Sequence, residues 1–219
     1  MNAPASSAIG KVHRVNNAGP IWPPHLMRQK LASKALRMAM LQGDYFTYSA
    51  SRLRTIAWLA EQACNGQADM DFFHGFTPWI ETHPERPYMA WSDCTFRDYI
   101  SLYHHREDFR SSDLARIEAQ ETEWLRGAQA LGFTSTWAAA RAVQDYSLDP
   151  ARVHVVGIVG ETECPAEVLY VGGQQFAFVS TDFPAKGGPQ VPETLPSLPP
   201  RRPDARLGAG GPPPADPRA

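Results

Sequence analysis

The sequence has few cysteines, and their spacing indicates no disulfide or metal-binding pair. Cys64, Cys94 and Cys164 are the only three in 219 residues, an odd number with no Cys-x-x-Cys arrangement. An odd number of widely spaced cysteines argues against a fold held together by disulfide bonds. The sequence therefore predicts free thiols in a reducing cytoplasm.

Long apolar runs and a strong charge of one sign are also missing. No run approaches the ~18 consecutive apolar residues of a membrane-spanning helix, and residues 1–8 lack the charged start and apolar centre of a signal peptide. The formal net charge of −2 provides no attraction to nucleic acid or to an anionic membrane. We expect a cytoplasmic protein with no transmembrane segment and no nucleic-acid partner; a peripheral membrane contact stays compatible with this composition.

Three common catalytic signatures are absent as well. The sequence contains no Gly-x-x-x-x-Gly-Lys-Ser/Thr loop, no Gly-x-Ser-x-Gly turn and no Gly-x-Gly-x-x-Gly fingerprint. This argues against the P-loop, hydrolase and dinucleotide-binding classes that those motifs define. The adjacent His104 and His105 have no partner at a spacing that builds a metal site. We therefore expect no metal ion.

The sequence does contain alternating helix and strand patterns. Helical spacing of apolar residues predicts helices over residues 26–41, 49–64, 112–125 and 136–146. Short apolar runs predict strands over residues 69–74, 87–92, 129–134, 153–157 and 176–179. Ser112 and Asp113 are suited to cap the third helix. This order predicts an α/β protein with a Rossmann-like parallel sheet and flanking helices.

Proline is concentrated at the end of the chain. More than half of the 20 prolines follow residue 183, so this segment is a poor candidate for regular structure. Pro192, Pro196, Pro199 and Pro200 would each break a helix at a cost of about 3 kcal/mol per interior proline. We expect no helix between residues 190 and 200, and a disordered or loosely packed tail over residues 189–219.

Two polar residues lie at the ends of expected strands. His74 closes the strand over residues 69–74, and Asp93 directly follows the strand over residues 87–92. Ligands bind outside the carboxyl ends of strands in open α/β sheets, and a carboxylate can orient a hydroxyl group by accepting its hydrogen bond. A structural histidine and a capping aspartate are the alternative interpretations of these two residues.

A third candidate follows the expected strand over residues 176–179. There the chain turns and reaches Lys186, Gly187 and Gly188. A point charge beside two unencumbered backbone amides suits a diphosphate group. An ordinary surface turn is the alternative interpretation of so short a motif.

Several stretches form a pattern that occurs together in one enzyme family. They are Phe133-Thr-Ser-Thr-Trp-Ala-Ala-Ala-Arg, Asp149-Pro-Ala-Arg-Val-His-Val-Val-Gly, the turn Ser92-Asp-Cys-Thr-Phe and the turn ending in Lys186-Gly-Gly. In this order they resemble the family-4 retaining glycosyltransferases of the GT-B fold. The likeness runs from about residue 45 to residue 188 and is strongest over residues 73–156.

The resemblance implies a partial GT-B fold. It divides the chain into a flexible leader (1–24), part of an acceptor-side Rossmann-like domain (25–170), the start of a nucleotide-sugar domain (171–188) and a Pro/Gly-rich tail (189–219). The implied reaction transfers a sugar from a nucleotide sugar, such as a UDP- or GDP-sugar, to the hydroxyl group of an acceptor glycan or small molecule. The family needs no metal ion or other cofactor for this transfer.

The resemblance also assigns roles on the acceptor side. His74 would face the transferred sugar, and Asp93 would contact the acceptor. Ser135 and Arg141 lie on the stretch that lines the cleft in this family and would bind the acceptor. Trp137, Ala138 and Ala139 on the same stretch are instead expected to serve helix packing.

On the donor side, Lys186 with Gly187 and Gly188 would bind the diphosphate. The positions where the family adds an arginine hold Thr181 and Ala185. The opening strand with its glycine-rich loop and a pair of glutamates spaced eight apart are also missing from the pattern. Two hypotheses follow. The first is a truncated glycosyltransferase, either inactive by itself or completed by a separate chain that supplies the missing domain. The second is a non-catalytic remnant that acts at most as a binding or interaction module.

Overall fold

The computed structural model describes residues 9–19, 21, 23, 31, 35, 43–64, 68–157, 175–180, 183, 184, 186–194 and 206–210. They belong to two compact units, Met1–Glu161 and Thr162–Ala219, each of which is described by itself. Most of the helix predicted over residues 26–41 lies outside the described residues, as do Cys164, Thr181 and Ala185.

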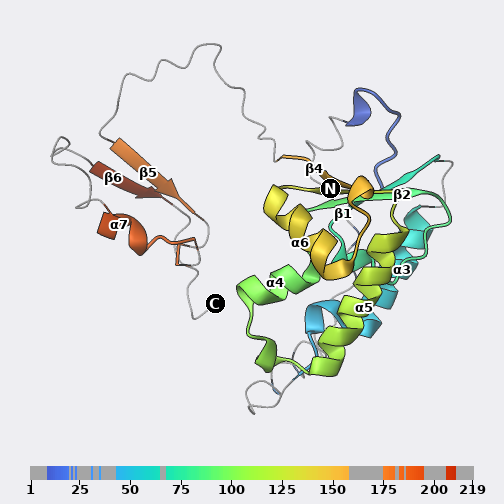
Figure 1. The fold of residues 1–219 in the computed structure, drawn as a ribbon, viewed down its shortest axis with the longest axis horizontal. Coiled ribbons are helices and arrows are strands. Elements are labelled where there is room, and N and C mark those ends of the chain that lie inside the picture. The colour runs from blue at the N-terminus through green and yellow to red at the C-terminus, as the bar shows by residue number, and fades with distance from the viewer. Residues whose placement is uncertain are drawn as a thin grey trace. The chain divides into compact units, whose positions relative to one another are not determined.

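The first unit contains a four-stranded parallel sheet in the order β1-β2-β3-β4. The strands are β1 (Asp71–His74), β2 (Tyr88–Ser92), β3 (Ala130–Phe133) and β4 (Val153–Val155), each within two residues of its predicted bounds. Right-handed crossovers between sequential parallel strands place the connecting helices on one face of the sheet. Figure 1 shows α4, α5 and α6 together on that face. The predicted Rossmann-like α/β architecture is confirmed in this unit.

Four long helices accompany the sheet. They are α3 (Ala50–Ala63), α4 (Phe96–Tyr103), α5 (Ser111–Gly127) and α6 (Thr136–Tyr146), and short 3₁₀ helices lie at η1 (Phe46–Tyr48), η2 (Thr77–Trp79), η3 (Arg106–Asp108) and η4 (Pro150–Arg152). Helices α3, α5 and α6 match the predictions, whereas α4 was not expected. The predicted cap of α5 is wrong, because Asp113 lies inside that helix, accepts a hydrogen bond from the Tyr45 amide (2.8 Å) and pairs with Arg116 (2.8 Å).

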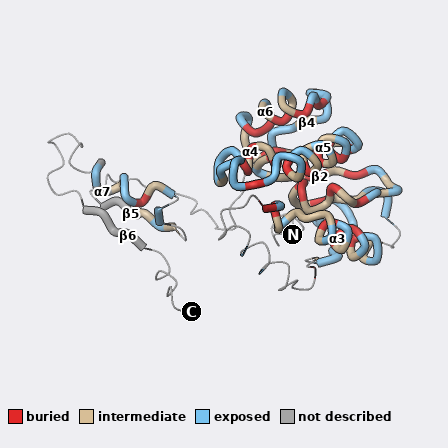
Figure 2. Tube along the Cα trace, turned by 90° about the horizontal axis from the view of Figure 1, so that it is seen from below, coloured by how far each residue is buried: buried red, intermediate tan, exposed pale blue. Residues whose placement is uncertain are grey.

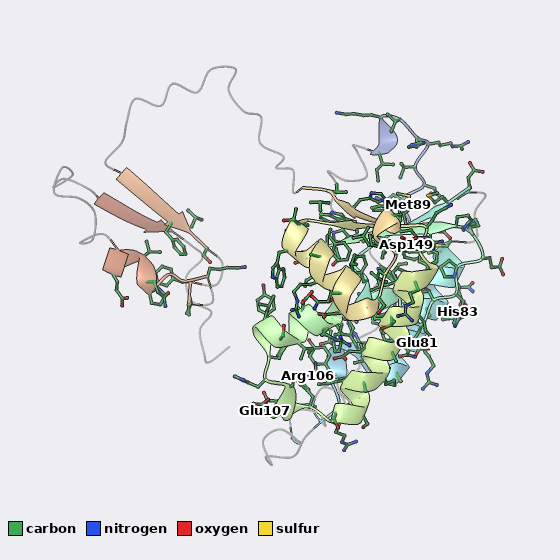
Figure 3. All side chains as sticks on the ribbon, viewed as in Figure 1. Glu81, His83, Met89, Arg106, Glu107 and Asp149 are labelled. Carbon is green, nitrogen blue, oxygen red and sulfur yellow. The ribbon has the colours of Figure 1, made fainter. Side chains whose placement is uncertain are left out.

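Alternation along the strands divides their side chains between two faces. Phe73, Ala90, Leu131 and Phe133 point into the core against the helices, and Figure 2 shows the buried segments along the strands and the helix sides that meet them. Burying a side chain such as phenylalanine or leucine contributes about 1.5–3 kcal/mol. Met89, labelled in Figure 3, alternates with the buried Tyr88 and Ala90 and so belongs to the other face.

On that other face, one row of paired residues runs across all four strands. The register pairs His74 with Trp91, Trp91 with Gly132, and Gly132 with His154. A Cβ atom at Gly132 would lie 2.8 Å from Trp91 Cδ1, so the indole covers the glycine. The absence of a side chain at position 132 therefore leaves the space that Trp91 occupies.

The second unit pairs β5 (Gln175–Val179) with β6 (Arg206–Gly210) in parallel, and α7 (Gln190–Thr194) lies between them in the chain. The prediction that residues 190–200 hold no helix is wrong for α7. Pro192 is the third residue of α7, in the first turn, where backbone N–H groups have no acceptor within the helix. A proline there removes no helix hydrogen bond. Strand β6 also lies within the tail that was predicted to be disordered.

None of the helices in the described ranges has the length and apolar character needed to cross a membrane.

Candidate ligand site at the carboxyl edge of the sheet

The carboxyl ends of β1, β2 and β3 lie side by side and begin three neighbouring loops. Gly75 N–H donates to the Trp91 carbonyl (2.7 Å), and Thr134 N–H donates to the Ser92 carbonyl (3.3 Å). These bonds continue the sheet by one residue beyond each strand. The structure therefore brings His74, Asp93 and Ser135 to one edge; the prediction from strand ends covered His74 and Asp93, and Ser135 was expected there from the family resemblance.

His74 is half-buried against the indole of Trp91. The two ring centroids are 5.0 Å apart, and the backbone carbonyl of His74 accepts a hydrogen bond from Trp79 Nε1 (2.9 Å). Burial lowers the pKa of His74, and the negative charge of Asp93 opposes that shift. The imidazole is therefore neutral at physiological pH and presents one N–H donor and one nitrogen acceptor.

Asp93 is exposed and is not the cap of the helix that follows it. Its carboxylate accepts a hydrogen bond from Ser92 Oγ (3.3 Å), whereas the cap of α4 is Thr95, whose side chain accepts from the Asp98 amide. The alternative interpretation of Asp93 as a capping residue is therefore wrong. Its carboxylate is open to solvent at the strand end and can accept further hydrogen bonds from a ligand.

Cys94 follows Asp93 but is unsuited to act as a nucleophile. Burial, with the nearby charge of Asp93, raises the pKa of the Cys94 thiol to about 12. The thiolate is the reactive form of cysteine, and at neutral pH almost none is present at this pKa.

Ser135 caps α6 at the end of β3. Its Oγ accepts a hydrogen bond from the Ala138 amide (3.2 Å), and its hydroxyl hydrogen stays available to a ligand. Ala138 and Ala139 pack in the core as predicted. The same expectation is wrong for Trp137, which is 49% exposed, because it lies on the side of α6 that carries Arg141 rather than on the side that meets the sheet.

Arg141 is held within the protein. Its Nε donates to Asp98 Oδ1 (2.8 Å), its Nη2 pairs with Asp145 (3.0 Å), and its guanidinium lies over the ring of Trp137 at 5.8 Å. Asp98 is completely buried, so Arg141 neutralises a charge that has no contact with water. The structure thus places Arg141, itself partly exposed, in an ion pair with the buried Asp98 on the second turn of α6, while Ser135 lies at the strand ends.

A buried carboxyl group lies beneath the strand ends. Glu121 of α5 is fully buried and accepts three hydrogen bonds: from Thr77 Oγ1 to Oε1 (2.6 Å), and from the Phe96 amide (2.8 Å) and Tyr146 hydroxyl (2.5 Å) to Oε2. Burial raises the pKa of Glu121 to about 7, although all three hydrogen bonds oppose the shift. Sequence reasoning placed Glu121 on α5 without a role.

A signal for Glu121 was present in the sequence. The buried stripe of α5 consists of Leu114, Ile117, Glu121, Trp124 and Leu125, so one carboxyl group interrupts an otherwise apolar face. Glutamate is almost never fully buried unless its charge or its oxygens find partners. The interruption indicates a polar network, but only the structure identifies the donors.

The predicted diphosphate contacts lie in the second unit, in the turn before α7. Gly187 N–H donates to the Pro184 carbonyl (3.2 Å), and Gly188 N–H donates to the Phe183 carbonyl (2.8 Å). Gly187 has φ +79°, and a Cβ atom at Gly188 would lie 2.5 Å from the Phe183 ring. The expectation of two unencumbered amides is wrong, because both serve the turn. Lys186 is exposed.

In the parts of the chain that the structure describes, no three histidine, cysteine, aspartate or glutamate side chains gather where they could hold a metal ion.

A comparison with protein-family models finds no match, and a comparison with curated proteins finds none either. The resemblance to family-4 glycosyltransferases therefore rests on the sequence motifs alone.

Proposed function

We propose that this chain is a glycosyltransferase of the GT-B type by ancestry, and that the carboxyl edge of its four-stranded sheet binds the sugar and the acceptor. The observation that supports this best is the placement of His74 and Asp93 at the ends of adjacent strands, where His74 pairs with Trp91, two residues before Asp93. Open parallel sheets bind ligands at this edge. We place the protein in the cytoplasm.

The proposed reaction moves a sugar from a UDP- or GDP-sugar to a hydroxyl group. The acceptor oxygen forms a bond to the anomeric carbon, the bond from that carbon to the diphosphate breaks, and the hydroxyl proton passes to the departing phosphate. Asp93 accepts a hydrogen bond from the acceptor hydroxyl and so orients its oxygen. Neutral His74 contacts the sugar, and Ser135 donates to the acceptor. Taken by itself, the second unit offers the exposed Lys186 as a positive charge for a diphosphate.

The test measures sugar transfer and hydrolysis from UDP- and GDP-sugars by the wild-type chain and by His74→Asn, Asp93→Asn and His83→Asn. His83 is exposed on the loop after η2 and is labelled in Figure 3, so it serves as the matched control. Loss of a group that orients the acceptor should lower the rate by at least about tenfold. Equal rates in all four proteins would rule out roles for His74 and Asp93.

A second candidate is a non-catalytic module that binds a sugar or a protein partner through the same edge. It is favoured by the turn at residues 186–188, where both glycine amides are already hydrogen-bonded and only the charge of Lys186 is left for a diphosphate. Thermal unfolding in millimolar UDP or GDP separates the two candidates, because a bound nucleotide must stabilise the folded protein. An unchanged melting temperature favours the binding module, and a clear increase favours the transferase.

A further inference from the structure

Two loops at the proposed site are tied to the same buried carboxyl group. Thr77 follows His74 by three residues and donates to Glu121 Oε1 (2.6 Å). Phe96 follows Asp93 by three residues, and its amide donates to Glu121 Oε2 (2.8 Å). A single side chain thus holds the segment that leaves β1 and the segment that leaves β2.

The link to the second loop is reinforced through Tyr146. The hydroxyl of Tyr146 donates to Glu121 Oε2 (2.5 Å) and accepts a hydrogen bond from the Arg97 amide (3.2 Å). The first two backbone amides of α4 therefore donate to Glu121 and to Tyr146, which is itself hydrogen-bonded to Glu121. Because the carboxyl group is fully buried, water cannot replace these bonds without opening the core.

We propose, within the ligand site proposed above, that Glu121 is a positioning residue that sets the placement of His74 relative to Asp93. The loops from β1 and β2 are short, so a change at Thr77 or Phe96 passes to the strand ends within three residues. Glu121 does not need to touch a ligand for this role. It acts through the two loops that it holds.

A change in the protonation state of Glu121 should then change the surroundings of the His74 ring. The ionisable groups around the Glu121 carboxyl lie on its own helix, α5, and on three other segments. They are Glu118 on α5, Tyr146 on α6, Tyr48 in η1, and Cys94 and Arg97 around the start of α4. Burial raises the pKa of Tyr48 and of Cys94 to about 12, whereas it raises that of Glu121 to about 7, so these two neighbours do not change charge where Glu121 does.

The experiment follows the ring signals of His74 by NMR from pH 4 to pH 9 in the full chain, with the signal assigned by its loss in His74→Asn. The variants are Glu121→Gln, Thr77→Val and the control Glu123→Gln, which alters an exposed glutamate on the same helix. Glu121→Gln keeps the shape and can still accept from Phe96 while donating to Thr77, but it cannot titrate. Thr77→Val keeps the charge of Glu121 and removes only the bond to the His74 loop.

We expect wild type and Glu123→Gln to show the titration of His74 together with a second inflection near pH 7. Glu121→Gln should lose the second inflection. Thr77→Val should weaken it and raise the pKa of His74 by roughly half a unit, because a looser loop admits water to the ring.

A wild-type curve in both Glu121→Gln and Thr77→Val would overturn the positioning role. A curve altered in Glu121→Gln but unchanged in Thr77→Val would also overturn it, because His74 would then sense only the field of the carboxylate. The titration needs no ligand. Glu121 can therefore fail as the positioning group while the proposed roles of His74 and Asp93 in sugar transfer stand, and the reverse also holds.

Discussion

Replacing Gly132 with alanine should push Trp91 toward His74 and destabilise the first unit. The new Cβ atom would lie 2.8 Å from Trp91 Cδ1, about 0.6 Å closer than the 3.4 Å at which ordinary contact begins. On its other side the indole meets the His74 ring, with the centroids 5.0 Å apart. The ring therefore has to move into the imidazole or tilt away from the sheet.

Two effects of opposite sign decide the net change in the free energy of unfolding. An alanine restricts the unfolded chain and stabilises by about 0.4–1 kcal/mol where the backbone allows it. Forcing an extra methyl group into a packed site costs about 1–3 kcal/mol. Trp91 Nε1 is buried and makes no hydrogen bond within the described residues, so moving the ring breaks none. We expect a net loss of about 0.5–2 kcal/mol for Gly132→Ala.

Urea unfolding of wild type, Gly132→Ala and Gly157→Ala measures this loss. Gly157 follows β4 and is exposed, and a Cβ atom added there would have no neighbour within 4 Å, so its alanine variant carries the backbone effect alone. The steric cost is the difference between the two variants. A Gly132→Ala protein as stable as Gly157→Ala would refute the close contact between Trp91 and Gly132.

Two further predictions concern ionisable groups in the core. Because the folded-state pKa of Glu121 is raised from 4.5 to about 7, the folded protein binds its proton more tightly, and the resulting stability is complete below pH 4.5 and lost as the pH rises through 7. Between pH 4.5 and pH 8, the free energy of unfolding of wild type should fall by on the order of 3 kcal/mol more than that of Glu121→Gln, as measured by denaturant unfolding. The opposite contribution of His74 cancels because both proteins contain it. Parallel pH dependence in the two proteins would contradict the prediction. Native Cys94, with a pKa of about 12 rather than 9, should react with iodoacetamide up to about a thousandfold more slowly than in urea, in proportion to its thiolate fraction. Equal labelling in the two states, read by peptide mass spectrometry, would contradict this.

Local signals in the sequence were sufficient for most of the first unit. The bounds of α6 agree with the prediction because Ser135 caps the helix through its own side chain. The four strands were found because short apolar runs between turns are typical of strands in a parallel sheet. Since the carboxyl ends of parallel strands share one edge, the same strand pattern places His74 and Asp93 together, whereas Ser135 was expected there only from the family resemblance.

Helix α4 was missed although Thr95 caps it locally, and its start also depends on distant partners. Its first amide donates to Glu121 and its second to Tyr146, residues that lie 25 and 49 positions further along the chain. No pattern within eight residues contains those partners. Helix α7 was missed for a different reason: the cost of a proline depends on its place in the helix, and Pro192 lies in the first turn.

The sequence by itself determined the alternation of strands and helices and the placement of polar residues at strand ends, because both depend on the order of side chains over a few residues. Only the tertiary structure decided what those residues can do. It paired Arg141 with the buried Asp98, exposed Trp137, and occupied the amides of Gly187 and Gly188. Glu121 shows the reason most clearly, since its three donors come from segments 25 to 44 residues away and meet only when the core closes around the carboxyl group.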